Sequence, residues 1–225
     1  MDDSLSLPQH VLDCIPQTPE CLAALDLARR ELPEPIFNHS LRVFLIAHQL
    51  SPDSAADEGA RADSLALLFV ACICHDLGTC DRFNGRQRFE VEGADAAAAL
   101  LQSHGRSEED GHRVWAAVAL HTSPGIAERF DPMTSLVRRA VVADFARPDA
   151  LPPDLARLRA CLPRLDVEKV LAHAVVSQAG PEDGLARPDS LTWPNTEKHP
   201  KSSWPGILLR AHLENPGFDG VNPAF

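Results

Sequence analysis

The sequence has no uninterrupted apolar run near the roughly 18 residues that a membrane-spanning helix requires, and no basic segment followed by an apolar stretch near its start. It is also poor in positive charge, because 21 lysines and arginines stand against 32 aspartates and glutamates, a formal net charge of −11. Phosphate backbones are bound by clustered Lys and Arg, so this balance argues against a general nucleic-acid binder. We therefore expect a cytoplasmic protein with no nucleic-acid partner and no membrane association.

The six cysteines include no pair with CxxC spacing, the usual spacing of redox and zinc-ribbon motifs. Cys72 and Cys74 lie in the most apolar stretch of the chain, Leu65 to Cys74, where buried reduced thiols are common. The cysteine pattern is therefore consistent with a reducing, cytosolic setting.

The chain also lacks any length of strand-like alternation and any internal repeat, and its apolar residues recur at helical spacing instead. Its 225 residues fit one domain. The sequence therefore predicts an all-α fold, a helical bundle with its core at about residues 35–178 and an irregular, proline-rich C-terminal extension at 179–225 that packs on it. We expect helices at about residues 18–32, 37–50, 61–76, 92–105, 107–122, 131–144, 154–161, 166–178 and 205–214.

A His-Asp pair, His75 and Asp76, ends the apolar run, and Gly78 follows as a suitable C-terminal cap for the central helix. Burying an ionised carboxylate beside an imidazole is costly unless something compensates for it. A divalent metal ion is the usual compensation, because carboxylate and neutral imidazole are both good ligands. The pair therefore predicts a metal site, provided that other helices supply further ligands.

Two more polar residues stand on apolar helix faces. His39 shares one face with Val43 and Ile46, and Asp144 ends the stripe that includes Val137. A single His on an apolar face is more often a satisfied core residue than a ligand. Four such residues on three helices are harder to explain as packing, and two imidazoles with two carboxylates leave a position for water or substrate.

The order His…His-Asp…Asp resembles the HD-domain superfamily of helical, metal-dependent hydrolases and lyases, and on its pattern the metal ligands would be His39, His75, Asp76 and Asp144. Longer blocks look like the cyanamide hydratase family over roughly residues 35–220. The blocks are Phe37–Val43, His75–Thr79, Arg88–Ala96, Ala119–Ala127, Trp204–Gly206 and Asn215–Phe218. This resemblance implies a zinc-containing HD fold that hydrates cyanamide to urea, although the ligand set also suits iron or manganese.

Hydration of a nitrile needs a group that takes a proton from water and delivers one to nitrogen. Glu92 follows a polar loop at a helix start and is one candidate, although it would equally well stabilise the helix N-terminus. His121 ends an apolar stripe and is another, its alternative being a core histidine. Asn38 and Thr79 stand next to the expected ligands and would orient substrate or support the ligands by hydrogen bonds.

Two other functions stay open at this point. An HD-type phosphohydrolase acting on a nucleotide or phosphomonoester would need a cationic cleft, for which Arg82, Arg86 and Arg88 are the candidates, but the acidic composition counts against it. The other alternative is a structural metal ion that only stabilises the fold, but the open coordination position would then have no function. We therefore favour an enzyme with a small-molecule substrate, and a homodimer is consistent with its size and helical class.

Overall fold

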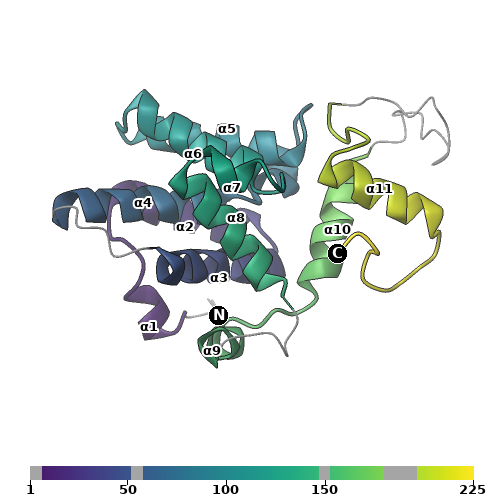
Figure 1. The fold of residues 1–225 in the computed structure, drawn as a ribbon, viewed down its shortest axis with the longest axis horizontal. Helices are drawn as coiled ribbons and strands as arrows, with labels where there is room; N and C mark the ends of the chain where they lie inside the picture. The colour runs from purple at the N-terminus through teal and green to yellow at the C-terminus, as the bar shows by residue number, and fades with distance from the viewer. Residues whose placement is uncertain (1–6, 52–57, 147–152, 180–196) are drawn as a thin grey trace.

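The computed structural model describes residues 7–51, 58–146, 153–179 and 197–225, and this part of the chain contains helices and turns without a strand (Figure 1). The all-α prediction is confirmed. In chain order the α-helices and 3-10 helices (η) are α1 (Gln9–Leu12), α2 (Pro19–Glu31), α3 (Glu34–Leu50), α4 (Glu58–Cys74), η1 (Leu77–Thr79), η2 (Asp81–Phe83), α5 (Phe89–Ser103), α6 (Glu108–Leu120), α7 (Ala127–Phe130), α8 (Pro132–Asp144), α9 (Pro153–Cys161), α10 (Val167–Ser177) and α11 (Trp204–Glu214). The expected proline-rich segment falls largely on residues 180–196, which lie outside the described residues.

Most helix boundaries follow the start signals in the sequence. Asp131 caps α8 by accepting hydrogen bonds from two backbone amides, at 2.8 and 3.1 Å, and Ser107 caps α6 by accepting one at 3.1 Å. Helix α3 begins at Glu34, earlier than predicted. The reason is that Pro35 stands in the first turn of α3, where no backbone N–H is needed, so the helix starts before this proline and not after it.

Helix α4 is the centre of the fold. Its residues from Ala66 to Cys74 are all buried, and it packs against α2, α3, α5, α6 and α8. The segment Glu58–Thr79 is long and apolar enough to cross a membrane by length and composition alone, since its most apolar window has a mean hydropathy of 1.4. Since 78% of its most apolar window is buried inside the fold, a position in the core accounts for this composition.

The two C-terminal helices form a pair beside the bundle. Helix α10 contacts α11 and also α3 and η1 (Figure 1). Residues 215–225 follow α11 and turn back along it, since the side chain of Asn222 donates a hydrogen bond to the carbonyl oxygen of Leu208 at 3.1 Å. The C-terminal part of the chain therefore contacts the bundle through α10, and also through Trp204 against Phe89 and Phe225 against Phe145.

Gly78, the predicted cap of the central helix, has a different role. Helix α4 ends at Cys74 and Gly78 lies within η1, without the positive φ of a glycine cap. A Cβ atom built on Gly78 would lie 1.9 Å from the carbonyl oxygen of Phe89 and 2.9 Å from the amide nitrogen of Gly93. Only a residue without a side chain therefore lets α5 approach the turn that follows α4.

We predict that Gly78→Ala destabilises the fold by about 3 kcal/mol or more, because the added methyl group would overlap backbone atoms of a packed helix. Gly111→Ala is the matched control. The nearest atom to its added Cβ is the Cβ of Ala98 at 4.0 Å, and alanine is favoured over glycine within a helix by roughly 0.5–1 kcal/mol. Urea denaturation of both variants measures the difference, and equal stabilities would contradict this role of Gly78.

Candidate metal centre

Four buried polar side chains meet at one place in the bundle. His39 lies within α3, His75 and Asp76 form the turn after α4, and His121 directly follows α6. The exposed fraction is 0% for His39 and His75, 1% for Asp76 and 2% for His121. Because α4 ends before the His-Asp pair, both side chains of the pair leave the helix where α3 and α6 bring the other two.

The imidazole rings direct their Nε2 atoms at one carboxylate. Nε2 of His75 lies 3.1 Å from Oδ2 of Asp76, and Nε2 of His39 lies 3.7 Å from the same oxygen. Nε2 of His121 lies 3.7 Å from Oδ1 of Asp76. One ligand atom from each of His39, His75 and Asp76 falls within 4.8 Å of the other two, and these three residues form a cluster that could hold a metal ion.

Hydrogen bonds at the opposite edge of each ring determine which nitrogen carries the proton. Nδ1 of His75 and Nδ1 of His121 donate to backbone carbonyl oxygens, at 2.7 and 2.6 Å. Nδ1 of His39 donates to Oδ2 of Asp144 at 2.6 Å. An oxygen acceptor requires an N–H, so in the neutral rings all three Nε2 atoms carry lone pairs.

The donor set fits a divalent metal ion. Lone pairs of three imidazoles and a carboxylate repel one another in a buried space unless positive charge lies between them. Oδ2 of Asp76 is buried without a hydrogen-bond partner of acceptable geometry. Burial disfavours a charged imidazole, yet the Asp76 carboxylate raises the pKa of His75, so this place favours a cation. A metal ion would satisfy Oδ2 and the lone pairs together.

The pKa values of the other two rings, His39 and His121, are lowered overall. Burial lowers the pKa of His39, and the neighbouring Asp144 offsets this only in part. Burial also lowers the pKa of His121 to about 3, and the nearby His75 adds to the shift. Both rings are therefore neutral at pH 7 and offer Nε2 as a ligand atom or a proton acceptor.

Asp144 is the predicted ligand that the structure places outside the cluster. Its Oδ1 accepts a hydrogen bond from Nε of Arg42 at 2.8 Å, and its Oδ2 accepts from Arg42 at 2.8 Å and from His39 at 2.6 Å. Burial opposes ionisation, but these hydrogen bonds hold the pKa of Asp144 well below its usual range. The carboxylate stands behind His39, at the ring edge opposite Asp76, and orients that ring. Direct ligation by Asp144 stays a prediction.

Arg42 explains the position of Asp144. It is fully buried and lies three residues after His39 on α3, so the two side chains reach the same carboxylate. Its Nη1 atom also donates a hydrogen bond to the carbonyl oxygen of Pro163 at 3.2 Å. Asn38, a predicted substrate-orienting residue, donates to that same carbonyl at 3.2 Å. Both side chains therefore tie α3 to the connection between α9 and α10.

Two other predicted residues support local turns. The hydroxyl of Thr79 donates to the carbonyl oxygen of Asp76 at 2.6 Å, which holds the turn that carries the His-Asp pair. Glu92 is partly exposed, and its carboxylate accepts a hydrogen bond from the amide of Gln87 at 2.7 Å. This contact ties the polar loop to the first turn of α5, the helix-start role that the sequence left open. A part in catalysis for either residue stays a prediction.

Glu90 is a buried acid that the sequence interpretation missed. It is 0% exposed and accepts hydrogen bonds from Arg88, at 3.0 and 2.6 Å, and from the hydroxyl of Thr122, the residue after His121. The signal was the same helical stripe that identified His39. Glu90 begins a fully buried series on α5 at i, i+4, i+7 and i+11, namely Glu90, Ala94, Ala97 and Leu101.

The chain matches a known protein family. The pattern of the HD domain family matches residues 36–158, which run from α3 into α9. A search of curated proteins finds no match to the chain. The matched segment covers more than half of the 225 residues and contains all four clustered residues as well as Asp144.

Proposed function

Since the chain belongs to the HD domain family of metal-dependent enzymes, we propose that it is a hydro-lyase that hydrates a small nitrile, with cyanamide as substrate and urea as product. The observation that carries the proposal is the chemistry around the cluster. Its imidazoles are buried and in contact with aromatic rings, and Arg42, the buried cation beside it, is engaged with Asp144 and backbone carbonyls. Such surroundings favour a small uncharged substrate. The blocks that resemble cyanamide hydratases support the same substrate.

Three residues would hold the metal ion. His39 and His75 would bind it through Nε2 and Asp76 through Oδ2, with Asp144 orienting His39 through Nδ1. Two imidazoles and a carboxylate suit zinc, with iron or manganese as alternatives. When bound, the ion supplies Lewis acidity that polarises the nitrile or acidifies a water molecule.

Hydration adds one water molecule across the carbon–nitrogen triple bond. The water oxygen bonds to the nitrile carbon, one C–N π bond breaks, and the nitrogen gains a proton; a further proton shift from oxygen to nitrogen completes urea. His121 would accept the proton of water at Nε2 and return it to nitrogen. The hydrogen bond from its Nδ1 to the carbonyl oxygen of Val118, at 2.6 Å, holds the ring in the orientation that this transfer needs.

An HD-type phosphohydrolase is the second candidate, and the arginines count against it. Arg82 is paired with Glu31 at 2.7 Å and Arg88 with Glu90 at 2.6 Å. Two of the three predicted phosphate-binding cations therefore already have carboxylate partners, and Arg86 is exposed on the loop. A bound phosphate needs cations that face it, so the uncharged substrate is better supported.

The direct test is urea release. Purified protein is loaded with Zn²⁺, Fe²⁺ or Mn²⁺, incubated with cyanamide, and assayed for urea. We expect urea formation that depends on the metal ion, and no phosphate release from p-nitrophenyl phosphate. Metal-loaded protein that leaves cyanamide unchanged would rule out this substrate, and phosphate release would favour the second candidate.

The same assay ranks the two candidates for proton transfer. We expect His121→Gln to lower kcat by about 10²–10⁴-fold, the usual contribution of general acid–base catalysis, while metal content stays unchanged. Glu92→Gln should change kcat only slightly, because its carboxylate is occupied with the loop. The reverse ranking would assign proton transfer to Glu92.

A further inference from the structure

Seven aromatic rings form a closed circuit that begins and ends at the metal centre. Adjacent ring centroids lie between 4.7 and 6.0 Å apart, in the order His39, His75, His121, Phe89, Trp204, Phe225, Phe145 and back to His39. The three imidazoles and Phe89 are buried, whereas the other three rings are partly exposed. The circuit therefore has a buried half at the metal centre and an outer half that faces solvent.

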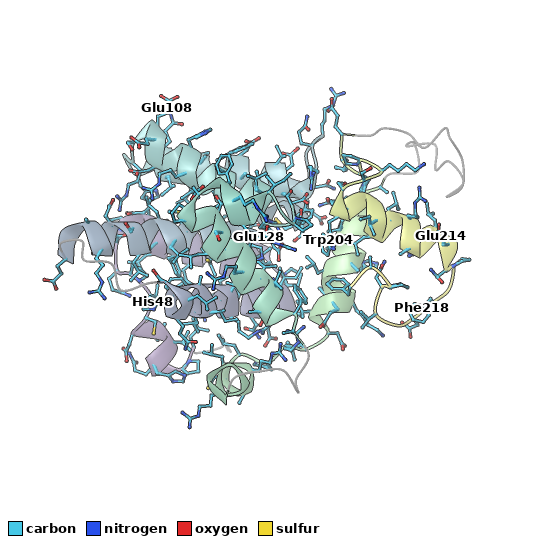
Figure 2. All side chains as sticks on the ribbon, in the orientation of Figure 1. His48, Glu108, Glu128, Trp204, Glu214 and Phe218 are labelled. Carbon is cyan, nitrogen blue, oxygen red and sulfur yellow. The ribbon has the colours of Figure 1, made fainter. Side chains whose placement is uncertain are left out.

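Phe225 is the outermost ring and joins the two sides of the circuit. It is 39% exposed, and its ring centroid lies 5.3 Å from that of Phe145 and 5.5 Å from that of Trp204. Phe145 directly follows α8 and lies 4.7 Å from His39. Trp204 begins α11 and lies where that helix faces the bundle (Figure 2). Because every side chain of the metal centre is at most 2% exposed, a substrate reaches it only when a covering group moves.

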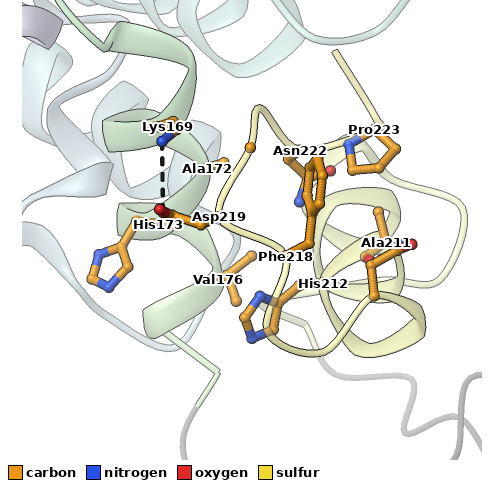
Figure 3. Close-up of a pocket in the computed structure, with 12 residues that line it drawn as sticks. Lys169, Ala172, His173, Val176, Ala211, His212, Phe218, Asp219, Asn222 and Pro223 are labelled. Carbon is orange, nitrogen blue, oxygen red and sulfur yellow. Dashed lines mark hydrogen bonds and ion pairs between the residues drawn. The ribbon is translucent and has the colours of Figure 1, made fainter.

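The segment that carries Phe225 is weakly attached. Residues 215–225 lie against α10 and α11 over a cavity of about 210 Å³, which Figure 3 shows between the two helices and the returning chain. The ion pair between Lys169 and Asp219, at 3.6 Å, is solvent-exposed and contributes little. The Asn222 side chain adds one hydrogen bond to α11. Asn215 also donates a hydrogen bond to α11, at 2.7 Å, and Ala224 packs partly buried against the core. Because most of the other residues of the segment are exposed, we expect it to open at a low free energy.

The outer rings also define what can pass them. Their faces are apolar, and Arg164, whose guanidinium stacks on Phe145 at 5.4 Å, is paired with Asp144 and Glu168. An anion would therefore have to compete with two carboxylates for Arg164. Displacement of one phenyl ring opens a path for a molecule of at most about that size.

We propose that Phe225 is the specificity-determining residue of this site: its ring closes the path between Phe145 and Trp204 and moves aside, with residues 215–225, to admit small uncharged molecules. The identity of the substrate rests on the proposed function, whereas the closure by Phe225 does not. Replacement of this ring should therefore increase access to the metal centre whether or not cyanamide is hydrated.

The test uses Phe225→Ala, with Phe218→Ala as the matched control. Phe218 lies on the same segment, is 59% exposed, and lines the cavity without joining the ring circuit (Figure 3). Zinc-loaded protein is mixed with the chelator 4-(2-pyridylazo)resorcinol, and the rate of zinc transfer is followed by absorbance. We expect Phe225→Ala to accelerate transfer by about tenfold or more, since two aromatic pairs are lost, and Phe218→Ala to match the wild type.

Two further readouts make the result independent of the substrate and of the metal. In the nitrile assay, Phe225→Ala should raise kcat/KM for benzonitrile relative to cyanamide by about tenfold. In zinc-free protein, Phe225→Ala should accelerate carbethoxylation of His121 by diethyl pyrocarbonate. Wild-type rates of zinc transfer and carbethoxylation in Phe225→Ala, or equal acceleration in Phe218→Ala, would overturn the proposal. Failure of cyanamide hydration with accelerated zinc transfer would refute the proposed substrate and leave the role of Phe225 supported.

Discussion

The His75→Ala variant is expected to lose metal binding and the proposed hydration of cyanamide together. His75 supplies the Nε2 atom nearest to Asp76, at 3.1 Å, and its ring occupies the middle of the cluster between His39 and His121. Loss of a residue that only supports a ligand already lowers metal affinity by roughly 10–100-fold, and loss of a direct ligand should cost more. Elemental analysis of the purified variant, together with the cyanamide assay, measures both effects.

His48→Ala is the control for this experiment. His48 is also a histidine of the bundle, but it is exposed near the end of α3 and stacks on Phe44, with ring centroids 5.9 Å apart (Figure 2). We expect this variant to keep the metal content and activity of the wild type. Full metal occupancy in His75→Ala would contradict the ligand assignment, and parallel losses in both variants would point to a general effect on folding.

The second large effect is expected from Arg42→Leu. Arg42 and Asp144 are both fully buried, and removal of Arg42 leaves the Asp144 carboxylate with only the more distant Arg164, 3.3 Å from Oδ2, as a described cationic partner. Loss of one partner of a buried ion pair costs about 3–5 kcal/mol. For a chain of this length the loss corresponds to a decrease in Tm of about 6–20 °C. The orientation of His39 should also be less fixed, because the carboxylate that holds its Nδ1 loses both hydrogen bonds from Arg42. Calorimetry measures the first effect and metal analysis the second.

Arg113→Leu tests whether the loss is specific. Arg113 lies on the exposed face of α6, so its replacement removes a similar side chain without exposing a buried charge. We expect its Tm to stay within about 2 °C of the wild type, as for most surface substitutions. A small shift for Arg42→Leu as well would show that the buried pair contributes little to stability.

Local patterns in the sequence predicted the helices and singled out all four clustered residues, with His121 as a candidate for proton transfer rather than as a ligand. The helical stripe with Val43 and Ile46 predicted that His39 points inward. The cost of burying Asp76 beside His75 indicated a metal ion from the sequence alone. These inferences succeed because helical periodicity and desolvation act over a few residues or on a single group. Glu90 obeys the same periodicity, so its burial was predictable as well.

The position of Asp144 was not predictable from such patterns. Its stripe showed correctly that it faces the core, but Arg42 lies one helical turn from His39 and competes for the same carboxylate. A stripe gives the face on which a side chain lies and not the partner that it meets. The choice between metal ligand and support for His39 depends on how α3 and α8 pack, and this packing is a property of the whole bundle.

The sequence by itself determined an all-α chain with capped helices and a His-His-Asp set on buried faces, because each of these features depends on interactions between near neighbours along the chain. Only the tertiary structure decided that Nε2 of His39, His75 and His121 faces Asp76, and that Asp144 accepts hydrogen bonds from Arg42 and His39. It also decided that Phe225 packs on Phe145, the ring next to His39. These contacts join segments far apart in the sequence. They follow from the packing of α3, α8 and the segment after α11, for which no local pattern carries a signal.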